Sequence, residues 1–160
     1  MILSFRKYLR SKHDKCFDHK LIKKLHKDHE KLLKLFLALE REIIHQSDKA
    51  LKKLNKFLEE LELHLLLENS KLYSHIELKY KFCELDKIKT IKEQIPQNAH
   101  LFNLLEHELK QKNYQKAQHI LSAIKDFLLR RISFEEEKLY TIYMKAHSCN
   151  TLQEILKPKI

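Results

Sequence analysis

The stretch ELHLLLENSKLY, residues 62–73, combines an apolar helical stripe with two polar side chains suited to binding chemistry. Leu61, Leu65 and Leu72 recur at the spacing of a helix that buries one face. His64 and Glu68 lie four residues apart, so both side chains leave a helix on the same face. The stretch therefore predicts a buried helix face that carries an imidazole and a carboxylate together.

A second stretch, RRISFEEEKLY (residues 130–140), repeats this plan. A shift of 67 positions lays residues 54–73 on residues 121–140, where His64 meets Arg131 and Glu68 meets Glu135. The same shift lays Lys-Leu-Tyr at 71–73 on Lys-Leu-Tyr at 138–140. Two related helix pairs are typical of a four-helix bundle, and we expect an all-α, antiparallel (up-down) one.

Length and composition support one helical domain. The chain has 160 residues, no glycine and two prolines, whereas a sheet protein needs turn residues. We expect helices over about 18–44, 49–80, 99–112 and 114–146, with Pro96 interrupting the helix and Asn98 capping the next one. The predicted organisation is a basic extension at 1–16, a bundle at 17–146 and a tail with a short helix at 147–160.

The cysteines predict a cytoplasmic protein, and the charge balance limits the kinds of partner that we expect. The net charge is +10 with histidine neutral, which suits an acidic partner or an anionic surface but is also typical of a lysine-rich solvated surface. No basic stretch alternates with aromatics as in single-strand binding, so we expect no specific nucleic acid. Three widely spaced cysteines favour reduced thiols, and no apolar run is long enough for a membrane span.

Each of the four expected helices places a polar residue toward the core. The inward candidates are His29, His64 with Glu68, His107 or His100, and Arg131 with Glu135. A buried charge is costly unless it is paired or binds a metal. Imidazole and carboxylate suit iron, manganese or zinc, and a bidentate pair of arginine with carboxylate needs no metal. Both interpretations remain open from the residues alone.

At this point the chain resembles the hemerythrin-like family, through DHEKL (28–32), HLLLENSKLY (64–73), LLEHEL (104–109) and RRISFEEEKLY (130–140). The resemblance implies a four-helix bundle with a non-haem iron site of one or two ions, and a protein that binds or senses oxygen, nitric oxide or iron. The ligands that it implies are His29, His64, Glu68, His107 and Glu135, with Glu136 as the alternative to Glu135.

The chain departs from this family at two positions. Arg131 stands where the family has a histidine, and arginine cannot bind a metal because it stays protonated. Asn103 stands where some members have a second histidine on the same helix as His107. Arg131 can instead pair with Glu68 and Glu135 and put a fixed cation in the place of a metal ion.

A second resemblance is to the bacterial anti-sigma regulators that bind sigma-70, through residues 113–140 and LELHLLLENSKLY (61–73). It implies a metal-free regulatory bundle that binds a protein partner such as a sigma factor. The chain shows no nucleophile–base set and no phosphate-binding glycine loop. We therefore expect no enzyme under either hypothesis.

Overall fold

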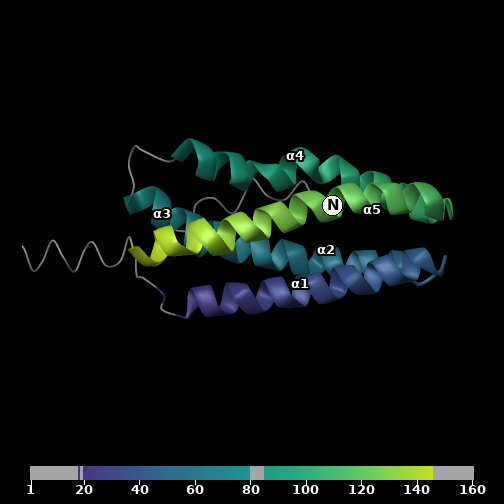
Figure 1. Ribbon diagram of the computed structural model, residues 1–160, viewed down its shortest axis with the longest axis horizontal. Coiled ribbons are helices and arrows are strands. Elements are labelled where there is room, and N and C mark those ends of the chain that lie inside the picture. Colours follow the sequence, from purple (N-terminus) through teal and green to yellow (C-terminus); the bar gives the residue numbers. More distant parts are fainter. Residues whose placement is uncertain (1–17, 19, 80–84, 146–160) are drawn as a thin grey trace, which may run out of the picture.

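The computed structural model describes residue 18 and residues 20–79 and 85–145, and all the regular structure in these ranges is helical (Figure 1). The predicted all-α helical bundle is confirmed. The predicted extension at 1–16 and tail at 147–160 lie outside the described residues. The elements in chain order are α1 (Leu21–Ile44), α2 (Ala50–Leu67), η1 (Glu68–Tyr73), α3 (Ser74–Lys79), α4 (Leu85–Lys110), α5 (Tyr114–Phe134) and η2 (Glu135–Leu139).

Helix α1 buries one apolar stripe that includes His29, the residue that the sequence analysis directs toward the core. Asp18 stabilises its start, because its Oδ1 accepts a hydrogen bond from the Lys20 amide at 2.9 Å and its carbonyl accepts one from the Leu21 amide. The polar residue of the stripe, His29, lies one turn from Leu25 on one side and from Leu32 on the other. The buried residues of α1 are Leu21, Leu25, His29, Leu32, Phe36, Leu39 and Ile43.

Two short π-helical segments interrupt the long helices, and the sequence did not predict them. The segment η1 separates α2 from α3 and begins at Glu68, while η2 follows α5 and begins at Glu135. These glutamates are the two that the 67-residue shift superposes. A π segment widens a helix by one residue per turn and is frequent at functional sites. The internal repeat therefore extends from sequence to backbone conformation.

Helix α4 contradicts the interruption expected at Pro96. It runs without a break from Leu85 to Lys110 with Pro96 inside it, so Asn98 does not begin a helix. Proline removes one backbone donor from a helix interior, and here it is the Lys92 carbonyl, four residues earlier, that loses its donor. The side chain of Asn98 donates to the neighbouring Gln94 carbonyl at 2.8 Å. The expected break was wrong, because the local pattern did not count the packing of neighbouring residues such as Ile95 against the core.

The core consists of two apolar clusters with polar side chains between them. The first cluster includes Leu32, Phe36, Phe57 and Leu128. The second cluster lies toward the other end of the bundle, with Leu25, Leu72, Tyr73, Leu139, Tyr140 and Tyr143 among its members. His29 lies between the two on α1, as Glu135 does between Leu128 and Leu139 on the last helix. A search of the described helices finds none long and apolar enough to cross a membrane.

Candidate metal centre

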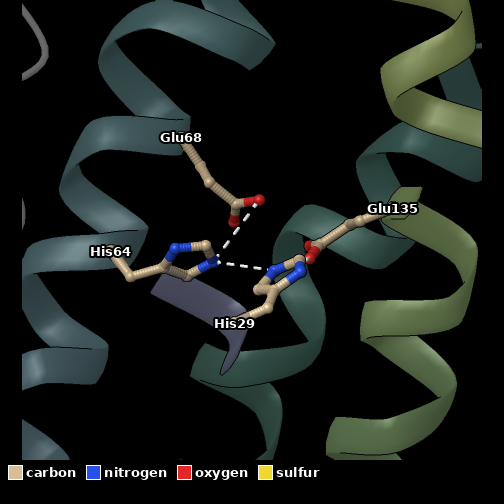
Figure 2. Close-up of side chains that lie close together, drawn as sticks. All are labelled: His29, His64, Glu68 and Glu135. Atoms are coloured by element: carbon tan, nitrogen blue, oxygen red, sulfur yellow. Dashed lines mark hydrogen bonds and ion pairs between the residues drawn. The ribbon is translucent and has the colours of Figure 1, made fainter. Parts of the chain in front are cut away.

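Four side chains of ligand type converge between the two apolar clusters (Figure 2). His29 comes from the middle of α1 and His64 from the last turn of α2, while Glu68 and Glu135 begin η1 and η2. One ligand atom of each residue lies within 4.8 Å of the others, and no side chain of the four is more than 4 % exposed. The helical stripes therefore bring together distant parts of the chain in a dry polar site.

The spacing of these atoms fits a single ion. The two imidazole Nε2 atoms of His29 and His64 lie 3.2 Å apart. His29 Nε2 lies 3.3 Å from Glu135 Oε2, and His64 Nε2 lies 3.6 Å from Glu68 Oε1. A tetrahedral ion that holds its ligands at about 2.1 Å separates them by about 3.4 Å, and an octahedral one by about 3.0 to 4.2 Å. The site matches these spacings with small side-chain adjustments.

The inner oxygens of the two carboxylates have only the imidazoles as polar neighbours. Glu68 Oε1 and Glu135 Oε2 are buried without a hydrogen bond of good geometry, at 3.6 Å from His64 Nε2 and 3.3 Å from His29 Nε2. Buried carboxylate oxygens normally have partners, because an unpaired one loses its hydration without compensation. Both atoms face the imidazole nitrogens, so an ion bound among the four residues would satisfy them.

The outer oxygens of the same carboxylates bind Arg131. Its Nε lies 2.7 Å from Glu135 Oε1, and its Nη2 lies 3.0 Å from Glu68 Oε2. Nη2 also donates to the Tyr73 hydroxyl at 3.3 Å, and Nη1 donates to the Ile91 carbonyl of α4. The guanidinium is 4 % exposed. Each carboxylate is therefore divided, with one oxygen on Arg131 and the other directed to the histidines.

Burial and charge shift the pKa values of the two histidines in opposite directions. Burial acts to lower the pKa of His29, but the carboxylates of Glu135 and Glu136 outweigh it and raise that pKa above its usual value. Burial, the His29 charge and the Arg131 charge lower the pKa of His64 to about 3. At neutral pH His64 is therefore a neutral imidazole, as a metal ligand must be.

The two buried carboxylates carry more negative charge than Arg131 alone can neutralise. Burial and the nearby Glu135 charge raise the pKa of Glu68 to about 8, against the opposing effect of Arg131. In the metal-free protein one proton, on His29 or Glu68, restores electroneutrality within the site. A bound divalent ion would replace that proton.

One further carboxylate orients the imidazole of His29 through Nδ1, and another lies near Nδ1 of His64. His29 Nδ1 lies 2.7 Å from Glu136 Oε1, which also lies 3.1 Å from Nδ1 of the surface residue His26. His64 Nδ1 accepts or donates no hydrogen bond within the described chain, and Asp28 Oδ2 is 4.0 Å away. A histidine whose Nδ1–H points to a carboxylate keeps Nε2 free to bind a metal. Glu136 lies on the Nδ1 side of His29 and Asp28 on the Nδ1 side of His64, as such a site requires.

Two buried tyrosines complete the walls of the site. Tyr140 Oη lies 3.4 Å from His29 Nε2, and Tyr73 Oη donates to Glu135 Oε1 at 3.4 Å. Burial raises the pKa of both hydroxyls, so both stay protonated. Each tyrosine packs in the second apolar cluster and places its hydroxyl at the polar layer.

The structure brings together four of the five ligands that the resemblance implied. His29, His64, Glu68 and Glu135 meet, while His107 is exposed on α4 and lies outside the cluster. Helix α4 buries Phe102, Leu105 and Leu109, and this face leaves His107 outside the core. Glu136 contacts His29 but is not one of the four.

Sequence reasoning also missed some features around the site. His75 is only 8 % exposed, and its ring lies 5.0 Å from the ring of Tyr143. The place of Asp28 beside the site could have been predicted, because it immediately precedes His29 and lies on the side of α1 that faces α2.

Comparisons of this chain with protein families, with curated proteins and with solved structures find no match. The geometry of the buried residues therefore carries the functional argument by itself.

Proposed function

We propose that the chain is a hemerythrin-like binding protein that holds one non-haem metal ion, by expectation iron, through His29, His64, Glu68 and Glu135. The ion would serve to bind or sense oxygen, nitric oxide or iron itself. Turnover of an organic substrate is not part of the proposal. The observation that carries it is the convergence of two buried carboxylate oxygens, Glu68 Oε1 and Glu135 Oε2, on two imidazole Nε2 atoms, without a hydrogen bond of good geometry to either oxygen.

The donor set limits the kind of ion. Two imidazoles and two carboxylates suit iron, manganese or zinc more than calcium or magnesium, which prefer oxygen ligands. An iron ion with four protein ligands keeps coordination positions for a small molecule, which is the chemistry that the metal would supply. The protein residues hold their ligand atoms in place, exclude water and neutralise charge.

Arg131 favours one ion over two. Its guanidinium binds the outer oxygen of each carboxylate at 2.7 and 3.0 Å, and those oxygens are the ones that a second ion would need. Arg131 also occupies the position that corresponds to His64 in the internal repeat. In this proposal a permanent cation replaces the second metal of a paired site.

The proposal includes two finer expectations about the protein. We take the bundle to be antiparallel, which is supported by the connections from α1 to α2 and from α4 to α5 that lie at the same end in Figure 1. We also place the protein in the cytoplasm, as the odd number of widely spaced cysteines favours.

Metal analysis of the purified protein tests the proposal. The protein would be produced with iron supplied and purified without oxygen, and its metal content would be measured for wild type and for His64→Ala. We expect about one ion per chain in wild type and a large loss in the variant, because neutral imidazole is half of the nitrogen donors. Wild-type protein with far less than one ion, unchanged by the substitution, would refute it.

A second candidate function is a metal-free regulatory bundle that binds a protein such as a sigma factor. The ion pairs of Arg131 with Glu68 and Glu135 favour it, because they neutralise much of the buried charge without a metal. Its test is a binding titration of the metal-free protein with a purified sigma-70 factor, repeated after metal loading. Saturable binding that does not depend on metal supports this candidate, and absence of binding to both forms removes it.

A further inference from the structure

A second feature adjoins the polar layer, namely a cavity of about 250 Å³ between α1, α2 and α5. The polar layer closes one end of it through His29, His64, Arg131 and Glu135. The first apolar cluster supplies much of the remaining wall, so an occupant meets carbon on most sides. The side chains that this cluster contributes include Phe36, Phe57, Leu61 and Leu128.

The two permanent cations of the wall are already paired inside the protein. Arg131 binds two carboxylates through Nε and Nη2, and its Nη1 donates to the Ile91 carbonyl. The Nζ of Lys125 lies 2.9 Å from a carboxylate oxygen of Glu40. Neither cation is therefore left over to bind an anionic ligand in the cavity.

The imidazoles and the carboxylate at the polar end likewise contact protein groups. His29 Nε2 lies 3.3 Å from Glu135 Oε2, and His29 Nδ1 lies 2.7 Å from Glu136 Oε1. His64 Nε2 lies 3.2 Å from His29 Nε2, and Asp28 lies on its Nδ1 side. Glu136 and Asp28 are not part of the cavity wall. A charged ligand would lose its hydration here and find no uncommitted partner.

Volume and wall together define the occupant. A buried water needs about two to four polar partners, whereas an apolar cavity of about 150 Å³ stays dry and binds benzene. A cavity of about 250 Å³ has room for one such ring with a short alkyl substituent. Neutral molecules of this kind gain free energy in proportion to the apolar area that they bury.

The cavity reaches the surface between α1 and α5. Leu37 on α1 and Leu129 on α5 both line it and are 52 % and 44 % exposed. A neutral molecule passes these two leucines without breaking the ion pair of Lys125 with Glu40. The entrance is therefore as apolar as the interior.

From these observations we infer that the cavity between α1, α2 and α5 binds a small neutral apolar molecule, of the class of benzene and its short alkyl derivatives. Such a molecule packs among the leucines and phenylalanines and against the polar layer. The inference does not depend on the proposed metal, because neither an ion nor a charged side chain takes part in the binding. It gives the chain a second ligand, chemically unlike the ion.

Toluene and benzoate are matched probes for the full-length protein, because they share a ring and differ in charge. We expect toluene to bind saturably, with about one molecule per chain, in a calorimetric titration in a sealed cell. Benzoate should bind about a hundredfold more weakly, because its carboxylate would lose its hydration without a free partner. Benzoate that binds as tightly as toluene would overturn the inference, as would toluene that does not bind.

A pair of variants locates the bound ring. Leu129→Trp places a larger side chain at the entrance, while Leu104→Trp changes a residue of nearly equal exposure, 43 %, on α4 outside the wall. We expect toluene affinity to fall about tenfold or more in the first variant, because the indole occupies space that the ligand needs. It should stay unchanged in the second. Equal toluene affinities in the two variants contradict the inference.

The outcomes separate this inference from the proposed function. The titration is run on protein stripped of metal with a chelator and again on metal-loaded protein, and equal toluene affinity is expected in both. Toluene that binds the metal-free protein supports the inference whatever the metal analysis gives. Toluene that binds the metal-loaded protein alone overturns it, because the wall would then not suffice. Stoichiometric metal without toluene binding overturns the inference and leaves the proposed metal site standing.

Discussion

Arg131 and Glu135 form a buried ion pair one turn apart, with 2.7 Å between Arg131 Nε and Glu135 Oε1. The pair uses one carboxylate oxygen and leaves Oε2 directed to the histidines. The same division occurs at Glu68, its counterpart in the repeat. Arg131 therefore neutralises the outer oxygen of each carboxylate. The inner oxygens and the two imidazoles remain arranged for one ion.

Arg131→His is expected to raise the metal content from about one to about two ions per chain, because it restores an imidazole at the position that mirrors His64. The metal-free variant should lose about 3–5 kcal/mol of unfolding free energy, as removal of one partner leaves buried carboxylates uncompensated. Metal analysis and denaturation with and without metal measure both effects.

Arg130→His provides the matched control, since Arg130 precedes Arg131 and is exposed. It should leave metal content and stability close to wild type. If Arg131→His still binds one ion or fewer at saturating metal, the guanidinium does not occupy the place of a second metal.

Metal binding is expected to strengthen as the pH rises to about 8, with about one proton released per ion. Burial and Glu135 raise the pKa of Glu68 to about 8 from an ordinary 4.5. Between these values the folded metal-free protein holds a proton that the unfolded chain has lost, so the contribution of Glu68 to its stability falls as pH rises. His29, whose pKa is also raised, acts in the same direction.

The measurement for this prediction is the metal-induced increase in melting temperature at about pH 5 and about pH 8. The increase should be larger at the higher pH, with Glu68→Gln reducing the difference. An increase that shrinks toward pH 8 would show that the ion does not compete with protons for these side chains.

His107→Ala is expected to keep full metal content, although the resemblance implied His107 as a ligand, because its side chain is exposed on α4. His64→Ala should lose most of the metal. Both variants remove one imidazole, so the comparison separates the buried site from nonspecific binding by surface histidines. Equal losses in the two variants would place the metal elsewhere.

Glu136→Gln is expected to weaken metal affinity about 10–100-fold while leaving the stoichiometry at one, because Glu136 orients His29 through Nδ1 at 2.7 Å. Glu137→Gln is the control, since Glu137 is exposed and contacts Ser133 instead. Competition with a metal chelator gives both affinities. Unchanged affinity in Glu136→Gln would show that the contact does not position the ligand.

Much of the fold and most of the site could be predicted from local periodicity. The stripe of α1 placed His29 correctly because six apolar residues fix that helix face, and the steps from Leu61 to His64 to Glu68 did the same on α2. Glu135 followed from Leu121, Ile124 and Leu128 on α5. In each case one residue of ligand type stands where the regular pattern would have an apolar residue. The structure buries that residue together with the apolar residues of the pattern.

The remainder depends on tertiary contacts that a local pattern does not contain. Helix α4 has histidines and leucines on adjoining faces, so the sequence alone did not decide that Phe102 and Leu105 would turn inward and leave His107 exposed. The π segments arise where Glu68 and Glu135 enter the polar layer, and no residue preference announces them. The helical course through Pro96 likewise lies outside a local pattern, because residues beside it such as Ile95 pack against the core.

X-ray absorption of the iron-loaded protein, prepared without oxygen, tests the central claim most directly. The account predicts one iron ion per chain with nitrogen and oxygen neighbours at about 2.0–2.2 Å, the outer-ring scattering of two imidazoles and no iron–iron scattering. An iron–iron distance in the spectrum would contradict the role given to Arg131. Iron without imidazole neighbours would contradict the site itself.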